Sequence, residues 1–171
     1  MLIRGPVTGV EAQCERVLRT VPAWFGIEES LLEYASNTAI LPTFVAEDGG
    51  QIIGFLSLRQ HLPAAWEVDC IAVEGTRRNG GIGRALHARV EDWLGAQGAQ
   101  FLQVKTLADS HPSAAYAETR KFYEKIGYHP LEVFPTLWAA HLPVLLLIKV
   151  LKLRASRDQP SQSATSTLSA P

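Results

Sequence analysis

The sequence has little that would mark a secreted, metal-binding or membrane-embedded protein. It has two cysteines, Cys14 and Cys70, and neither belongs to a Cys-x-x-Cys pair, so neither a disulfide framework nor a zinc site is indicated. Its most apolar run, 144–153, is interrupted by Lys149 and Lys152 and is too short to span a bilayer. The N-terminus lacks the apolar segment of a signal peptide. We therefore expect a cytoplasmic protein with no membrane partner.

The charge balance and the length of the chain further restrict the class of protein. The chain carries 16 lysines and arginines against 17 aspartates and glutamates, so no basic excess points to a nucleic-acid partner. Its five histidines are scattered singly, without metal-ligand spacing, and we expect most of them on the surface. A chain of 171 residues suffices for one domain with a substantial core. We expect that domain to span 1–153 and the Ser-rich segment 154–171 to be disordered.

The most informative segment is a glycine-rich stretch between an apolar run and an amphipathic pattern. Residues 78–84 read Arg-Asn-Gly-Gly-Ile-Gly-Arg, after the apolar run 68–73 and before helical periodicity. The order strand, glycine turn, helix leaves the first backbone N–H groups of the helix without partners. Aligned peptide dipoles add partial positive charge there, and glycines let an anion approach the backbone. The segment therefore predicts a main-chain phosphate-binding site.

The glycine spacing distinguishes between kinds of phosphate-binding loop. A P-loop needs Lys and then Ser or Thr after its last glycine, whereas Arg-Ala follows Gly83 here. A dinucleotide-binding loop needs a small third residue at the position that Leu86 occupies. The pattern that fits is Arg78-x-x-Gly81-x-Gly83.

A second motif follows downstream, with one expected strand in between. Residues 122–128 read Phe-Tyr-Glu-Lys-Ile-Gly-Tyr, and Gly127 stands where a helix would end. The two motifs resemble the Arg/Gln-x-x-Gly-x-Gly/Ala loop and the Phe/Leu-Tyr-x-x-x-Gly-Phe/Tyr segment of the GCN5-related N-acetyltransferases (GNAT). The resemblance is good over 41–151 and loose over 1–40. It implies that acetyl-coenzyme A (acetyl-CoA) is the cosubstrate and that the glycine loop holds its diphosphate.

Hydrophobic periodicity predicts an α+β domain. Helices are expected over 10–21, 28–37, 83–97 and 112–126, and strands over 2–4, 43–46, 52–58, 66–73, 101–106, 128–134 and 144–151. On two of the helices we expect inward faces of Leu31, Leu32 and Ala35, and of Ala115, Thr119, Phe122 and Ile126. The resemblance implies the GNAT acyl-CoA N-acyltransferase fold, a mixed, largely antiparallel sheet flanked by helices. It also implies a split between the strands that end near Val73 and Thr106.

The resemblance further implies contacts to acetyl-CoA from two segments. Backbone groups of Ile71, Ala72 and Val73 would meet the pantetheine arm, in the manner of an added strand. The diphosphate would lie on Arg78, Asn79, Gly80, Gly81, Ile82, Gly83 and Arg84. Arg77 and Arg84 either add charge-assisted contacts or face solvent. Tyr116 stands where the family often has a coenzyme-contacting asparagine, so it either contacts the coenzyme or lines the acceptor site.

Two carboxylates on the strand before the loop are candidate general bases. By the period of two, Glu67, Asp69, Ile71 and Val73 are expected to share one face. Two like charges held close together raise the pKa of one carboxyl group toward a useful value. Glu67 lies eleven positions before Arg78, the offset at which related histone acetyltransferases carry a catalytic glutamate. Glu67 is therefore the first choice and Asp69 the second; the alternative is that both simply pair with arginines.

Tyr123 is the candidate general acid for the departing thiolate. A tyrosine ordinarily has a pKa of about 10 and is protonated at neutral pH. The resemblance places the Tyr123 hydroxyl near the coenzyme sulfur. The alternative is a core tyrosine with a satisfied hydroxyl, which we expect Tyr128 to be.

These features predict an N-acetyltransferase that moves acetyl from acetyl-CoA to a primary amine of a small molecule or peptide, by direct attack in a ternary complex. The rivals are a non-catalytic acyl-CoA-binding sensor and a dinucleotide-binding domain. The sequence leaves the acceptor, the acyl-chain length and the oligomeric state open, with a homodimer as one alternative. The aromatic residues Trp24, Phe25, Trp66 and Trp138 either line the acceptor site or pack ordinarily, and we favour packing.

Overall fold

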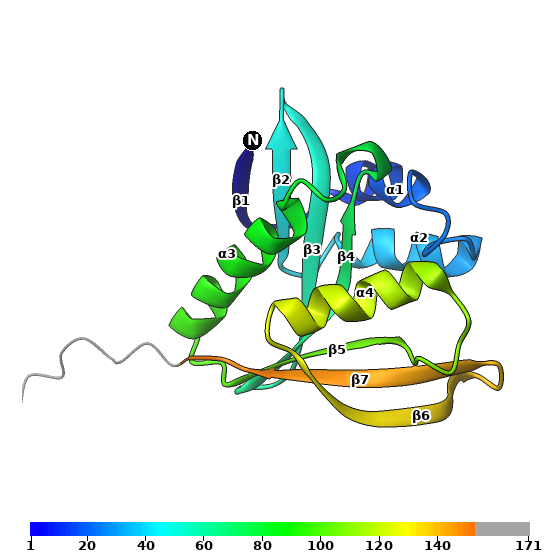
Figure 1. The fold of residues 1–171 in the computed structure, drawn as a ribbon. Helices are drawn as coiled ribbons and strands as arrows, with labels where there is room; N and C mark the ends of the chain where they lie inside the picture. The colour runs from blue at the N-terminus through cyan, green and yellow to red at the C-terminus, as the bar shows by residue number, and fades with distance from the viewer. Residues whose placement is uncertain (153–171) are drawn as a thin grey trace, which may run out of the picture.

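The computed structural model describes residues 1–152, which form a seven-stranded sheet with two helices on each face (Figure 1). It confirms the predicted mixed fold, and the segment 154–171 lies outside the described residues. The strands are β1 (Leu2–Val7), β2 (Thr43–Asp48), β3 (Gln51–Leu62), β4 (Ala65–Val73), β5 (Phe101–Leu107), β6 (His129–Ala139) and β7 (Leu142–Val150). The helices are α1 (Glu11–Arg19), α2 (Glu28–Asn37), α3 (Ile82–Ala96) and α4 (Ala114–Lys125), with a short 3₁₀ turn at Gly75–Arg77.

The strand order is β1-β2-β3-β4-β5-β7-β6, and every neighbouring pair is antiparallel except β4 and β5. The register of this parallel pair runs from Ala65–Glu67 on β4 to Phe101–Gln103 on β5 and goes no further. Beyond Glu67 the two strands separate, and β4 continues into the glycine loop (Figure 1). This opening, which we call the splay, is the predicted split, and it arises where hydrogen bonding between β4 and β5 ends.

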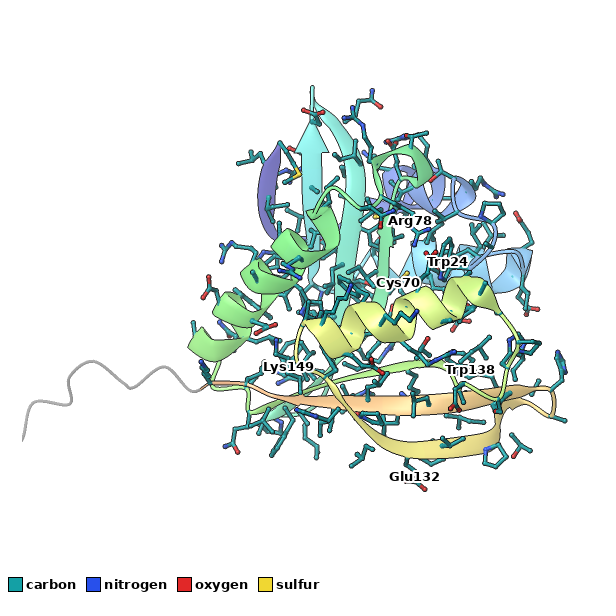
Figure 2. All side chains as sticks on the ribbon, in the orientation of Figure 1. Trp24, Cys70, Arg78, Glu132, Trp138 and Lys149 are labelled. Carbon is teal, nitrogen blue, oxygen red and sulfur yellow. The ribbon has the colours of Figure 1, made fainter. Side chains whose placement is uncertain are left out.

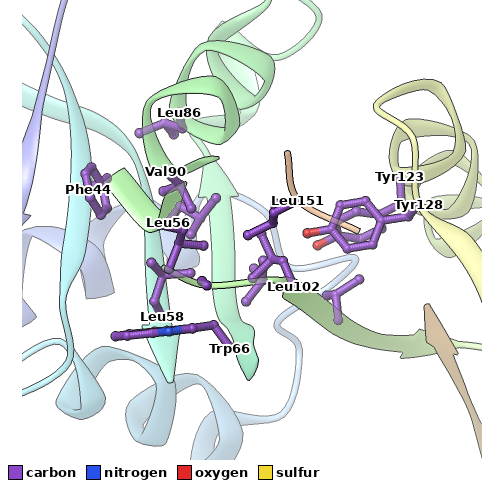
Figure 3. Close-up of a cluster of buried hydrophobic side chains, with 14 of the residues drawn as sticks. Phe44, Leu56, Leu58, Trp66, Leu86, Val90, Leu102, Tyr123, Tyr128 and Leu151 are labelled. Carbon is purple, nitrogen blue, oxygen red and sulfur yellow. The ribbon is translucent and has the colours of Figure 1, made fainter. Parts of the chain in front are cut away.

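Each face of the sheet carries its own apolar core. One core joins the sheet to α3 and α4, and Figure 3 shows part of it, including Leu56, Leu58, Trp66, Leu86, Val90, Leu102, Tyr123 and Tyr128. The other core joins the sheet to α1 and α2 and includes Cys14, Leu18, Leu31, Phe55, Cys70 and Ala72. Because β4 contributes to both cores, it is packed on both faces up to Val73, its last residue.

Local sequence signals explain most element boundaries. Gly49 and Gly50 have φ of 56° and 78°, the positive values that a two-residue turn between β2 and β3 requires. The side chain of Ser113 accepts a hydrogen bond from the backbone N–H of Tyr116 and caps α4, so Pro112 precedes the helix instead of lying in its first turn. Gly127, with φ of 92°, follows the end of α4 as predicted.

Some predicted helix faces were wrong. Leu31 and Ala35 of α2 are buried, but Leu32 is 43% exposed because the sheet covers a narrower stripe of this helix. On α4 the fully buried residue is Tyr123 rather than the predicted set 115, 119, 122 and 126, whose members are half-buried. Trp66 packs edge-on against Trp93 in the core, so the packing alternative holds for it.

A β-bulge in β4 overturns the prediction that four of its residues share one face. Ser57 on β3 pairs with Cys70 and Leu58 pairs with Val68, so Asp69 is an extra residue without a direct partner. Val68 points into the core under α3, whereas Cys70 points into the core under α2. The bulge therefore reverses the alternation. Glu67 and Asp69 face the α2 side, and Ile71 and Val73 pack on the α3 side.

Candidate active site

The glycine loop connects β4 to α3 at the wide end of the splay. Asn79 and Gly81 have left-handed backbone conformations, with φ of 64° and 81°. Gly81 is also the N-cap of α3 and makes no side-chain capping bond, so the first N–H groups of the helix have no side chain folded over them. A Cβ placed on Gly81 would meet no protein atom within 4 Å. This loop fits an anionic diphosphate, because it combines bare backbone donors with open space in front of them.

The arginines around the loop have different partners. Arg78 stacks on the Trp24 ring, 4.0 Å from its centroid, and its NH2 lies 3.0 Å from the Glu118 carboxylate on α4 (Figure 2). Arg77 pairs with Asp48 at 3.2 Å, so it faces the β2–β3 turn rather than the front of the loop. Arg84 is exposed on the first turn of α3. Arg78 thus ties the loop to α4 across the splay, and Arg84 is the exposed cation next to the loop.

The second predicted coenzyme contact is the edge of β4 beyond Glu67, where β4 no longer pairs with β5. Ile71, Ala72 and Val73 pair with β3 on one side, while β5 has diverged on the other. A strand without a neighbour presents backbone N–H and C=O groups to a ligand that runs alongside it. The fold therefore leaves these residues in the position that binding of an extended pantetheine arm requires.

Glu67 is the last β4 residue paired with β5, so it lies at the vertex of the splay. Lys105 Nζ lies 2.7 and 2.6 Å from its two carboxylate oxygens, Gln103 Nε2 donates at 2.9 Å, and His61 Nε2 lies 2.6 Å from Oε2. Burial by itself would raise the pKa of Glu67, but these hydrogen bonds outweigh it and hold the pKa below its usual value. For Glu67 the predicted upward shift was therefore wrong, and the carboxylate is ionised at neutral pH.

Asp69, the bulged residue, lies deeper on the same side. Arg59 Nε and NH2 donate to its Oδ1 at 3.0 and 2.7 Å, and Asn37 of α2 donates to Oδ2 at 3.2 Å. The Asp69 side chain is 7% exposed and that of Arg59 is 42% exposed. The alternative of pairing with arginine therefore holds for Asp69, whereas Glu67 pairs with a lysine.

Tyr123 of α4 is 2% exposed and belongs to the core between the sheet, α3 and α4. Burial raises the pKa of its hydroxyl, with further increases from Cys70 on β4 and Tyr34 on α2. A phenol held in its protonated form is a proton donor, as the predicted acid role requires. Its ring also packs edge-on against Tyr128, with centroids 5.1 Å apart.

Tyr128 has the satisfied hydroxyl that we predicted. Its Oη lies 3.2 Å from Nε2 of His87, whose Nδ1 lies 3.2 Å from Glu91, and Lys149 donates to Glu91. His87 is 1% exposed and is the exception to the prediction that most histidines lie on the surface, which holds for His61, His129 and His141. The sequence held a weak signal that His87 is buried and paired, since His87 continues the buried stripe of α3 and precedes Glu91 by one helical turn.

Tyr34 of α2, which the sequence did not single out, is half-buried and packs against the core that contains Cys70. Tyr116 of α4 donates a hydrogen bond from its hydroxyl to the Trp24 carbonyl oxygen at 3.1 Å, next to the segment between α1 and α2. Both roles proposed for Tyr116 stay predictions. No local pattern indicated Tyr34, because only tertiary packing brings α2 beneath β4.

The part of the chain that the structure describes lacks two other classes of feature. Within 1–152 no group of three His, Cys, Asp or Glu side chains is placed to hold a metal ion. None of the helices in this range is long and apolar enough to cross a bilayer.

Comparison with known proteins agrees with this arrangement. Residues 40–130, more than half of the chain, match the family model described as acetyltransferase (GNAT) domain. No curated protein sequence matches the chain significantly. Similar solved structures include an aminoglycoside 6′-N-acetyltransferase complexed with coenzyme A (TM-score 0.71, 21% identity, 91% of this chain and 100% of that one).

Two further structures show the same fold. The aminoglycoside 6′-N-acetyltransferase from Enterococcus faecium has a TM-score of 0.71 and 20% identity, over 91% of this chain and 100% of its own. The ribosomal-protein-S18-alanine N-acetyltransferase from Escherichia coli has a TM-score of 0.70 and 18% identity, over 90% and 96%. At these identities the structures establish the fold alone, and their different acceptors do not transfer to this chain.

Proposed function

The chain belongs to the GNAT acetyltransferase family, and we propose that it transfers the acetyl group of acetyl-CoA to a primary amine of a small molecule or peptide. The observation that carries the proposal is the splay between β4 and β5 beside a glycine loop with bare N–H groups. A diphosphate on the loop and a pantetheine arm along Ile71 to Val73 would direct the thioester toward Tyr123 and the vertex at Glu67. Both substrates would then meet in one ternary complex, and proximity would supply much of the rate enhancement.

The residues at the vertex suggest how the protons move. Glu67, or Asp69 as second choice, takes a proton from the acceptor ammonium, and the neutral nitrogen attacks the thioester carbonyl carbon. The C–S bond then breaks, and the coenzyme leaves as a thiolate that takes the Tyr123 proton. The attacking nitrogen loses its second proton as the amide forms, and that proton restores the phenol. This route needs an ionised carboxylate and a protonated phenol at the same pH, and both forms are present at neutral pH. The lowered pKa of Glu67 makes it a weaker base, and the raised pKa of Tyr123 a weaker acid, than the free side chains, so the route depends on positioning of the substrates.

A non-catalytic acyl-CoA sensor remains the second candidate, and one observation favours it. The carboxylates of Glu67 and Asp69 are both occupied by cations, Lys105 and Arg59, as they would be in a domain without base catalysis. A sensor would bind coenzyme A and release no thiol with any amine in a broad panel. Acetyl transfer to any amine at a rate above the uncatalysed reaction would exclude it.

We expect coenzyme A to bind and NAD not to bind. The glycine spacing suits the first ligand, and Leu86, fully buried where a dinucleotide-binding helix needs a small residue, opposes the second. Isothermal titration of the purified protein with each ligand decides the matter. Binding of NAD with no binding of coenzyme A would overturn the assignment of the loop.

We expect Glu67→Gln to lower turnover by roughly a hundredfold or more, the usual range for losing a general base. The loss should be greatest at low pH, where the acceptor ammonium is hardest to deprotonate. The lowered pKa of Glu67 keeps its carboxylate ionised across the neutral range. The pH dependence of the loss in turnover therefore arises from the acceptor ammonium group. Rate profiles of Glu67→Gln and Asp69→Asn, measured side by side, test this. A larger loss in Asp69→Asn, with Glu67→Gln near wild type, would move the base to Asp69.

A further inference from the structure

Four aromatic side chains meet on the α2 side of the splay, and we call them the aromatic group: Trp24, Phe25, Tyr34 and Tyr116. Trp24 donates from Nε1 to Thr119 Oγ1 at 2.9 Å, and its carbonyl oxygen accepts from the Tyr116 hydroxyl at 3.1 Å. The Phe25 ring lies edge-on to Tyr34, with centroids 5.8 Å apart. All four are partly exposed, and Phe25 and Tyr34 also pack against the core under α1 and α2, so each presents only part of its ring to a ligand.

The aromatic group lies against the predicted reaction centre. Phe25 and Tyr34 pack against the core cluster that contains Cys70 and Ala72 of β4. Burial raises the pKa of the Tyr34 and Tyr116 hydroxyls, and Cys70 raises each further, so both hydroxyls stay neutral. Figure 2 shows Trp24 between Arg78 and α4. The aromatic group therefore presents aromatic rings and uncharged hydroxyl groups beside the splay.

The two carboxylates near the vertex already have cationic partners. Asp69 is paired with Arg59 and Glu67 with Lys105, so an acceptor ammonium group would share each carboxylate with a side chain of the protein. At the rim, Glu33 of α2 lies near enough to Arg59 to raise the pKa of that guanidinium, together with Asp69, its hydrogen-bonded partner and the larger influence. A substrate with several positive charges would have to compete with Arg59 and Lys105 for the two carboxylates near the vertex, at a cost in desolvation.

From this arrangement we propose that the acceptor is a monoamine whose amino group is borne on an uncharged aromatic or apolar body, and that Phe25 and Tyr34 contact that body. The inference rests on the proposed acetyl transfer and names the substrate class of the same site. Edge-to-face packing against two rings and burial of apolar surface would stabilise the complex. Arg78 already covers one face of the Trp24 ring at 4.0 Å, so the contact is assigned to Phe25 and Tyr34.

Thiol release from acetyl-CoA by the full-length protein tests the substrate class directly. The panel is 2-phenylethylamine, ethylamine, spermidine and an aminoglycoside, which vary the ring and the number of charges. We expect kcat/KM for 2-phenylethylamine to exceed that for ethylamine and for spermidine by about tenfold or more, the usual scale for filling an apolar site. A preference for spermidine or the aminoglycoside would overturn the inference.

Variants of the aromatic group separate recognition from folding. Phe25→Ala, and Phe25→Leu as a version that keeps apolar bulk, are expected to lower kcat/KM for 2-phenylethylamine about tenfold, with ethylamine and coenzyme affinity unchanged. Leu32→Ala is the matched control, since Leu32 is an apolar α2 residue that is 43% exposed and outside the aromatic group. Equal losses for both amines in both Phe25 variants would return Phe25 to a packing role.

The outcomes also distinguish this inference from the proposed function. If coenzyme A binds and no amine in the panel, ring-bearing or not, releases thiol, the acetyltransferase proposal fails and the substrate class fails with it. If spermidine or ethylamine is acetylated and 2-phenylethylamine is not, the acetyltransferase proposal stands and only the substrate class is wrong.

Discussion

Tyr123→Phe is expected to lower the acetyl-transfer rate by about a hundredfold to ten-thousandfold while leaving coenzyme affinity nearly unchanged. The proposed role of the hydroxyl is to protonate the departing thiolate, a charge that develops only during the reaction. Its loss should therefore appear in kcat and not in ground-state binding. Burial raises the pKa of Tyr123, so the donor is fully protonated at the pH of the assay. Steady-state rates and a coenzyme titration on the same variant measure both effects.

Tyr128→Phe is the matched control for this experiment. The two tyrosine rings are in edge contact and equally buried, at 2% exposure each, but the Tyr128 hydroxyl is bonded to His87. Its removal should cost stability, because Nε2 of the buried His87 loses its partner, and leave the chemical step intact. A thioester with a better leaving group should also suffer less from Tyr123→Phe. Full activity of Tyr123→Phe with acetyl-CoA would reduce Tyr123 to a packing residue and leave water as the proton donor.

Gly81→Val is expected to abolish coenzyme binding while the fold survives. The Cβ would project into the open space in front of the first N–H groups of α3, where the diphosphate is proposed to lie. In addition, φ of 81° is unfavourable for a β-branched residue by roughly 1–2 kcal/mol, so the loop would also change its shape. Calorimetric titration with coenzyme A, after circular dichroism has confirmed folding, measures the effect.

The end of α3 provides the control for backbone strain. Gly98 has φ of 75° and, like Gly81, no protein atom within 4 Å of a built Cβ, but it lies beyond the C-terminus of the helix. Gly98→Val should therefore impose a similar conformational penalty and leave coenzyme affinity unchanged. Equal affinity in wild type, Gly98→Val and a folded Gly81→Val would show that the diphosphate does not lie on this loop.

The sequence by itself determined the features that depend on local interactions. The boundaries of α2 were predicted residue for residue, because helical periodicity needs only neighbours three and four positions away. The glycine loop was predicted in the same way, since a strand, a glycine turn and a helix start are adjacent in the chain. The fold class followed from the order of these elements and from the two motifs around Gly81 and Tyr123.

Only the tertiary structure decided which side chains meet at the splay. The period of two placed Glu67 with Ile71, but the bulge at Asp69 reversed the alternation, and a bulge exists only in the pairing of β4 with β3. Likewise, the low pKa of Glu67 depends on Lys105, which parallel pairing brings to it from 38 positions further along the chain. Distances between residues far apart in sequence are set by packing of whole elements, and local patterns do not contain them.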